Sequence, residues 1–134
     1  MKKDNNYNEI IAGTCLLLTI AKADEILEAL EINSIKTIIS DFFKLETKET
    51  ELIFDQSIDN LNKSTDLYEF SKILNNTFSY QDKIDFICCA FEVAFSDGKL
   101  HYIEEHFIKK ISNTLNVEHS DLIKAKQEIK SLFK

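Results

Sequence analysis

Carboxylates at one turn of this chain are placed where they could cap a helix or bind a cation. The segment AFSDGKLHYIEE (94–105) joins two apolar runs. Its Asp97-Gly98 pair predicts a tight turn, because glycine tolerates positive φ and Asp hydrogen-bonds its own backbone. His101 and Glu104 have the spacing of a capping box, in which a Glu at the third helical position accepts a hydrogen bond from the N–H of the cap residue.

His101 also precedes Glu104 and Glu105 by three and four residues, so all three side chains would lie on one helical turn. Such a group can chelate a transition metal such as Zn²⁺, with Asp97 or Glu92 as a further ligand, although zinc sites normally have more closely spaced His or Cys residues. His101 and Glu105 are therefore secondary metal-ligand candidates. The alternative is that they are solvated residues at the start of a helix.

The sequence contains no recognisable catalytic motif. It has no nucleophile elbow, no phosphate-cradling glycine loop and no His-Glu-x-x-His pair. Cys15, Cys88 and Cys89 lie in apolar runs, which predicts buried, reduced thiols. No catalytic residue is predicted, and we expect the protein not to be an enzyme. A hydrolase using the acidic residues as a two-metal site is the weakest alternative, because it needs more ligands than the sequence offers.

Composition restricts the function further. The 134 residues suit one domain, 1–134, and all 16 bases are lysines against 23 acids, which gives a net charge of −7. This balance disfavours nucleic-acid binding and a phosphate clamp. Residues 24–69 hold 12 acids and 4 lysines, which predicts an acidic side suited to a cation or a basic partner surface. With no signal peptide and no long apolar run, we expect a cytoplasmic protein without membrane insertion, of undetermined oligomeric state.

The elements that must position these acids are helices. The absence of proline and the presence of only two glycines favour helix over sheet. Apolar residues recur at helical spacing in seven segments, of which the first and the fifth are apolar on most sides and should be central. The predicted all-α bundle therefore has seven helices, at 7–22, 29–44, 47–60, 66–78, 80–96, 102–115 and 119–133.

An internal repeat relates the two ends of the chain. A shift of 73 residues places Asp24 on Asp97 and Glu31 on Glu104, within a shared pattern Ala-x-x-Asp-x-x-Leu-x-x-x-Glu-x-x-x-Ile-x-x-Ile. The repeat predicts two halves, about 10–61 and 80–133, related by a pseudo-twofold axis. If so, the acidic turns of the two halves can face each other.

A helix ending in Ala-x-x-Asp-Gly-x-Leu-x-x-x-Glu, within an all-helical chain of this length, resembles the TerB family of tellurite resistance proteins. The resemblance extends over roughly 10–130 and depends most on AFSDGKLHYIEE. The first motif, AKADEILEALE, has Glu25 where the family has glycine. TerB-like domains also occur in co-chaperones of the DjlA type. The resemblance implies a bundle of about seven helices, a link to stress or tellurite-resistance systems, and no established enzyme activity.

Carried over residue by residue, the resemblance implies a divalent-metal site formed by Asp24, Glu31, Asp97 and Glu104. Four carboxylates in one patch would suit a hard cation such as Ca²⁺, Mg²⁺ or Mn²⁺. We therefore expect a non-enzymatic cytoplasmic binding module that binds a divalent cation (Ca²⁺, Mg²⁺, Mn²⁺ or Zn²⁺) and docks on another protein. The alternative is a scaffold for protein–protein interaction in which the acids only make turns and caps.

Overall fold

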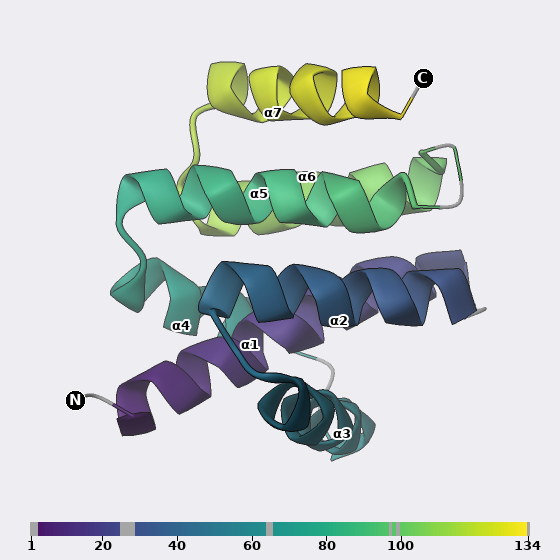
Figure 1. Cartoon of the computed structure of the whole chain (residues 1–134). Coiled ribbons are helices and arrows are strands. Elements are labelled where there is room, and N and C mark those ends of the chain that lie inside the picture. Colours follow the sequence, from purple (N-terminus) through teal and green to yellow (C-terminus); the bar gives the residue numbers. More distant parts are fainter. Residues whose placement is uncertain (1–2, 25–28, 64–65, 97, 99, 134) are drawn as a thin grey trace.

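The computed structural model describes residues 3–24, 29–63, 66–96, 98 and 100–133. These residues form seven α-helices and one short 3-10 helix, without a strand, which confirms the all-α prediction (Figure 1). The first helix begins at Lys3 rather than at residue 7, because nothing in the polar KDNNY segment breaks a helix. The elements are α1 (Lys3–Ala21), η1 (Lys22–Asp24), α2 (Ala29–Phe43), α3 (Thr47–Lys63), α4 (Leu67–Thr77), α5 (Tyr80–Ala94), α6 (Tyr102–Thr114) and α7 (His119–Leu132).

Two helices organise the bundle, as the apolar pattern predicted. α1 packs against α2, α3, α4, α5 and α6, and α5 packs against α1, α2, α6 and α7. Figure 1 shows α7 and α3 on opposite outer sides, with α7 against α5 and α3 against α1. In the same view α7 runs alongside α5, whereas α3 is seen nearly end-on and crosses the direction of α1. The pseudo-twofold axis itself stays a prediction from the sequence.

The core consists of apolar side chains from both central helices. On α1, the run from Cys15 to Leu18 is at most 1% exposed, and on α5 the same is true of Phe86, Ile87 and Phe91. A helix that is apolar on most sides removes its hydrophobic surface from water only when neighbouring helices cover all of those sides. This explains why α1 and α5 are the helices with most of their sides covered.

An aromatic cluster joins the end of α2 to α5. The rings of Phe42, Phe43, Phe78 and Phe86 lie 4.8 to 6.5 Å apart in edge-to-face or tilted pairs. Gly13 of α1 lies against this cluster, since a Cβ atom built there would be 3.0 Å from Phe43 Cζ and 3.2 Å from Phe86 Cε1. The missing side chain lets α1 approach the two rings closely.

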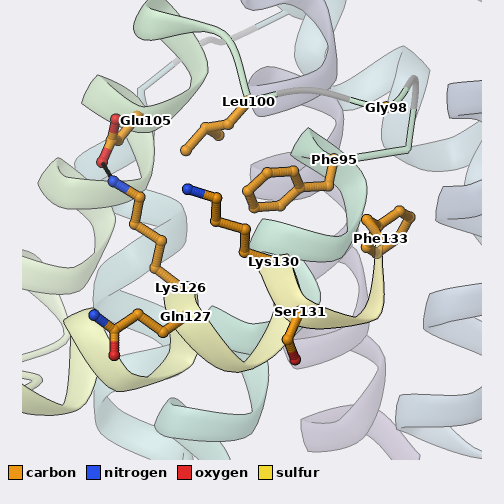
Figure 2. Close-up of a pocket in the computed structure, with 9 residues that line it drawn as sticks. All are labelled: Phe95, Gly98, Leu100, Glu105, Lys126, Gln127, Lys130, Ser131 and Phe133. Carbon is orange, nitrogen blue, oxygen red and sulfur yellow. Dashed lines mark hydrogen bonds and ion pairs between the residues drawn. The ribbon is translucent and has the colours of Figure 1, made fainter.

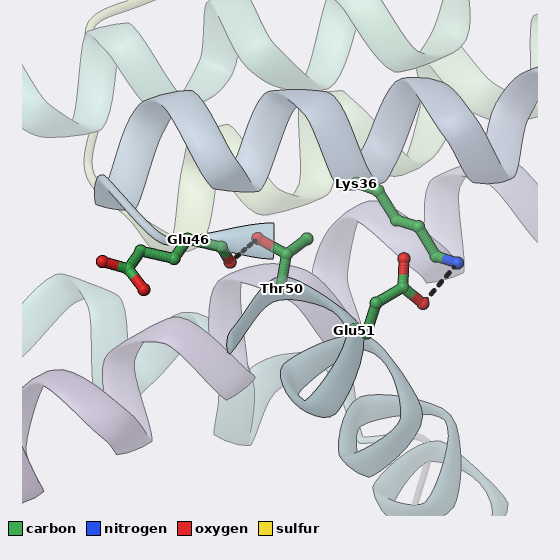
Figure 3. A network of polar contacts seen from close by, with 4 residues as sticks. All are labelled: Lys36, Glu46, Thr50 and Glu51. Carbon is green, nitrogen blue, oxygen red and sulfur yellow. Dashed lines mark hydrogen bonds and ion pairs between the residues drawn. The ribbon is translucent and has the colours of Figure 1, made fainter. Parts of the chain in front are cut away.

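Polar contacts connect α2 to α3 at the surface. The Lys36 Nζ atom lies 3.0 Å from Glu51 Oε1 and 4.8 Å from the centre of the Phe54 ring. On α3, the hydroxyl of Thr50 donates to the Glu46 carbonyl oxygen at 2.9 Å (Figure 3). These contacts support the packing of α3 but involve none of the predicted metal ligands.

The second helix of each predicted half ends in the same way. Lys44 follows α2 with φ +57°, and the N–H of Leu45 donates to the Ser40 carbonyl at 2.9 Å. Asn116 follows the end of α6 with φ +62°, and the N–H of Val117 donates to the Ser112 carbonyl at 3.0 Å. Both are Schellman closures with a residue other than glycine in the left-handed position.

The three cysteines are free thiols, as expected. Cys15 and Cys89 are buried, but Cys88 is only half-buried, because the part of α5 that carries it is not fully covered. Burial raises the pKa of Cys15 and of Cys88 to about 11, which keeps both protonated at neutral pH. No helix within the described ranges is both long enough and apolar enough to span a membrane.

Candidate functional site

The predicted ligands within the described residues belong to helix ends that the fold gathers at one end of the bundle. In Figure 1, α1 and α5 finish at the right, where α2 and α6 begin and where α7 also finishes. η1, which carries the backbone of Asp24, packs against α6. Segments about 80 residues apart in sequence therefore meet at this end.

Glu31 and Glu104 are the clearest feature of this end. Each lies in the first turn of its helix, α2 or α6, and their exposed fractions are only 2% and 0%. Oε1 of Glu104 accepts a hydrogen bond from the backbone N–H of His101 at 3.2 Å, which confirms the predicted capping contact. Both carboxylates have interaction partners, as buried acids require. Matching positions of the two predicted halves thus hold buried acids.

The structure describes the other two predicted ligands, Asp24 and Asp97, only in part or not at all. The backbone of Asp24 forms the end of η1, while its side chain and the whole of Asp97 lie outside the described residues. Gly98, beside Asp97, has the positive φ (+100°) expected of the turn, and its N–H donates to the Phe95 carbonyl at 2.8 Å. Where side chains are described, no group of three or more His, Cys, Asp or Glu residues could hold a metal ion.

The secondary candidates have different surroundings. His101 is the half-buried N-cap residue of α6. Glu105 reaches α7 instead, where its Oε2 atom lies 2.5 Å from Nζ of Lys126. Glu92, on α5, is half-buried, and its pKa is raised by burial and by the negative charge of Asp41 on α2. The structure therefore places Glu105 in an ion pair with α7 and Glu92 near an acid of α2.

The sequence did not predict a pocket that opens beside these acids. A cavity of about 610 Å³ lies between the end of α5, the start of α6 and the last two turns of α7 (Figure 2). Phe95 and Leu100 contribute apolar surface, and the Phe133 ring stacks on Phe95 with a centroid distance of 5.9 Å. Lys126 and Lys130 line its α7 side. The sequence feature that could have indicated this pocket is the four-residue spacing of the two lysines, which places both on one face of a helix.

Comparisons with known proteins agree with the fold. The family model described as tellurite resistance protein TerB matches residues 10–127. The crystal structure of a protein of unknown function from Porphyromonas gingivalis W83 superposes with a TM-score of 0.69. It shares 15% sequence identity, and the match covers 93% of this chain and 95% of that one, so it supports the fold alone. None of the curated proteins compared with the sequence matches it.

Proposed function

Because this chain belongs to the TerB family of tellurite resistance proteins, we propose that it is a non-enzymatic, cytoplasmic binding module that binds a divalent cation and docks on a protein partner. The proposed ligands are Asp24, Glu31, Asp97 and Glu104. The observation that supports this site is the burial of Glu31 and Glu104 at matching helix starts, beside the packed η1–α6 contact. Carboxylate oxygens are the donors that Ca²⁺, Mg²⁺ and Mn²⁺ prefer.

Burial of these two acids has a physical consequence that favours a cation. A carboxylate removed from water loses hydration, and it is retained in folded proteins when positive charge, donors or a metal compensate for that loss. For Glu104, one compensating donor is the backbone N–H of His101. A divalent cation shared between the two acidic turns would add the strongest compensating charge at this end of the bundle.

The test is thermal unfolding of chelator-treated protein with and without Ca²⁺, Mg²⁺, Mn²⁺ or Zn²⁺ at millimolar concentration. An ion at ten times its Kd stabilises the folded state by about 1.4 kcal/mol. For a chain of 134 residues this raises Tm by about 5 °C. Glu104→Gln, which retains an oxygen acceptor for the His101 N–H but removes the charge, is expected to abolish the rise. Asp97→Asn is expected to do the same.

Glu49→Gln is the matched control. Oε1 of Glu49 accepts a hydrogen bond from the Glu46 N–H at 3.1 Å, so it has the same capping role as Glu104 but lies on α3, in the exposed first turn. Its ion-dependent Tm rise should equal that of the unmodified protein. If no ion changes Tm, or if Glu104→Gln and Glu49→Gln respond to the ion equally, the metal site is refuted.

The alternative function is a protein–protein scaffold in which the acids are only structural. In that case Glu104→Ala lowers stability by about 0.5–2 kcal/mol through the lost cap, equally with and without the ion. Tyr102, 84% exposed at the start of α6, and Leu132, 73% exposed at the end of α7, favour a docking role at this end of the bundle. The same titration separates the two functions.

A further inference from the structure

The pocket between α5, α6 and α7 combines apolar surface with positive charge. Figure 2 shows Lys130 extending from α7 into the pocket toward Leu100, with Phe95 on one side and the Lys126–Glu105 pair on the other. Among the residues described as lining the pocket, two are lysines and one, Glu105, is an acid. In a chain with net charge −7, this is a local reversal of sign.

The two lysines are not equivalent. Glu105 neutralises Lys126 at an Nζ–Oε2 distance of 2.5 Å. The ammonium group of Lys130 forms no ion pair with any residue that the structure describes. Lys130 therefore offers an uncompensated positive charge over the apolar surface of Phe95 and Leu100. A group with a carboxylate next to an apolar side chain would complement both features.

Exposed apolar side chains also occur on the helix ends that form the pocket. Phe133, which lines the pocket, is 38% exposed, and the adjacent Leu132 is 73% exposed. On α6, Tyr102 precedes Glu105 by three residues, so both lie on the same helix face, and Tyr102 is 84% exposed. A small ligand inside the cavity would leave the exposed part of Phe133 in water, whereas a peptide crossing the opening would cover it.

From this arrangement we infer that the pocket is the docking site for a partner segment in which an aromatic or aliphatic residue lies next to acidic residues. The apolar anchor occupies the cavity against Phe95, Leu100 and Phe133, and an acidic side chain pairs with Lys130. This inference rests on the docking part of the proposed function and names its partner chemistry. Of the four proposed metal ligands, the two whose side chains the structure describes, Glu31 and Glu104, do not line the pocket, so the two sites can be tested separately.

The test is fluorescence anisotropy with a fluorescein-labelled peptide carrying one Phe followed by a run of aspartates, in chelator-containing buffer. Lys130→Gln should weaken binding about three- to fivefold, as expected for a partly exposed ion pair. Phe133→Ser should weaken it about tenfold through loss of the apolar contact. Glu105→Gln should strengthen binding, since it removes the pocket's acid and releases Lys126. Lys109→Gln, an exposed lysine on α6 outside the pocket, is the matched control and should change nothing.

Two further measurements make the result unambiguous. Circular dichroism of each variant checks that the helices remain formed, and a peptide with Asn in place of Asp should bind more weakly than the acidic one. Equal binding of the two peptides, or equal affinities of Lys130→Gln and Lys109→Gln, would overturn the inference. So would binding of decanoate in the pocket without binding of the peptide. If the peptide does not bind while the ion still raises Tm, only the docking site fails.

Discussion

The close contact of Gly13 with the aromatic cluster leads to a prediction that can be worked out from distances. A methyl group added by Gly13→Ala would meet Phe43 Cζ at 3.0 Å and Phe86 Cε1 at 3.2 Å. Carbon atoms in favourable contact are about 3.5–4.0 Å apart, so at least one ring must move. Phe86 is 1% exposed and enclosed, whereas Phe43 is only half-buried, so we expect Phe43 to be displaced.

Two opposing effects set the magnitude. Alanine is better than glycine inside a helix by about 0.8–1.0 kcal/mol, which favours the variant. Overpacking a filled core costs about 1–3 kcal/mol, which disfavours it. The expected net result is a loss of about 1 kcal/mol, or about 4 °C in Tm for a chain of 134 residues. Phe43→Leu removes the two Phe43 ring atoms nearest to the new methyl group, at 3.0 and 3.4 Å, and leaves only the 3.2 Å contact with Phe86, so in that background Gly13→Ala should be neutral or stabilising.

A double-mutant cycle measured by urea unfolding tests this reasoning. The coupling free energy between Gly13→Ala and Phe43→Leu should be about 1–2 kcal/mol, in the direction of relief. Gly98→Ala is the control, because its Cβ would meet nothing within 4 Å, yet φ is +100°. It should cost about 1–2 kcal/mol from backbone strain and add to Phe43→Leu without coupling. A coupling below about 0.5 kcal/mol for Gly13→Ala would refute the close contact.

Three further outcomes are expected. Lys44→Gly should raise the free energy of unfolding in urea by about 1 kcal/mol, because Lys44 has a φ of +57°, which favours glycine. Asn116→Gly should raise it by less, because asparagine tolerates a left-handed φ better than lysine does. Ser112→Ala should leave stability unchanged or raise it, because the buried Ser112 hydroxyl has no hydrogen-bond partner among the described residues. Ser40→Ala should lower stability by about 1 kcal/mol, because it removes the 3.0 Å hydrogen bond from the Ser40 hydroxyl to the Leu45 carbonyl. Burial raises the pKa of Cys15 from 9.0 to about 11, so the protonated thiol contributes fully to stability below pH 9, and this contribution is lost as the pH rises toward 11. Alkylation of Cys15 in the folded protein at pH 8, followed by mass spectrometry, should therefore be slow, and fast alkylation would contradict the prediction.

Local features were predictable because they depend on neighbours in the sequence. The apolar residues of α1 and α5 recur at helical spacing on most sides, and these helices are the central ones. The contact of Glu104 with the His101 N–H spans one helical turn, and it too was predictable from spacing. The partial exposure of Cys88 was not predictable from the sequence, because it depends on where the neighbouring helices leave α5 uncovered.

The candidate site also combines features that could be predicted from the sequence with features that depend on packing. Its acids were identified from the repeat and from the resemblance to the TerB family, but their burial was not. An acid at the start of a helix is usually solvated, and only the packing of the bundle decides that Glu31 and Glu104 are enclosed. The pocket was missed for a related reason. Lys130 and Phe95 belong to helices far apart in sequence, and no local spacing relates them.

By itself, then, the sequence determined the helices and the two that are buried, and it indicated the acids that we propose as cation ligands. Helical spacing, helix-breaking residues and capping contacts act within a few residues, so they can be read along the chain. Only the tertiary structure decided which helix ends meet, that two acids there are removed from water, and that Lys130 lies over an apolar pocket. These depend on how faces of distant helices pack, because burial and the compensation of charge are set by whichever neighbour the fold supplies.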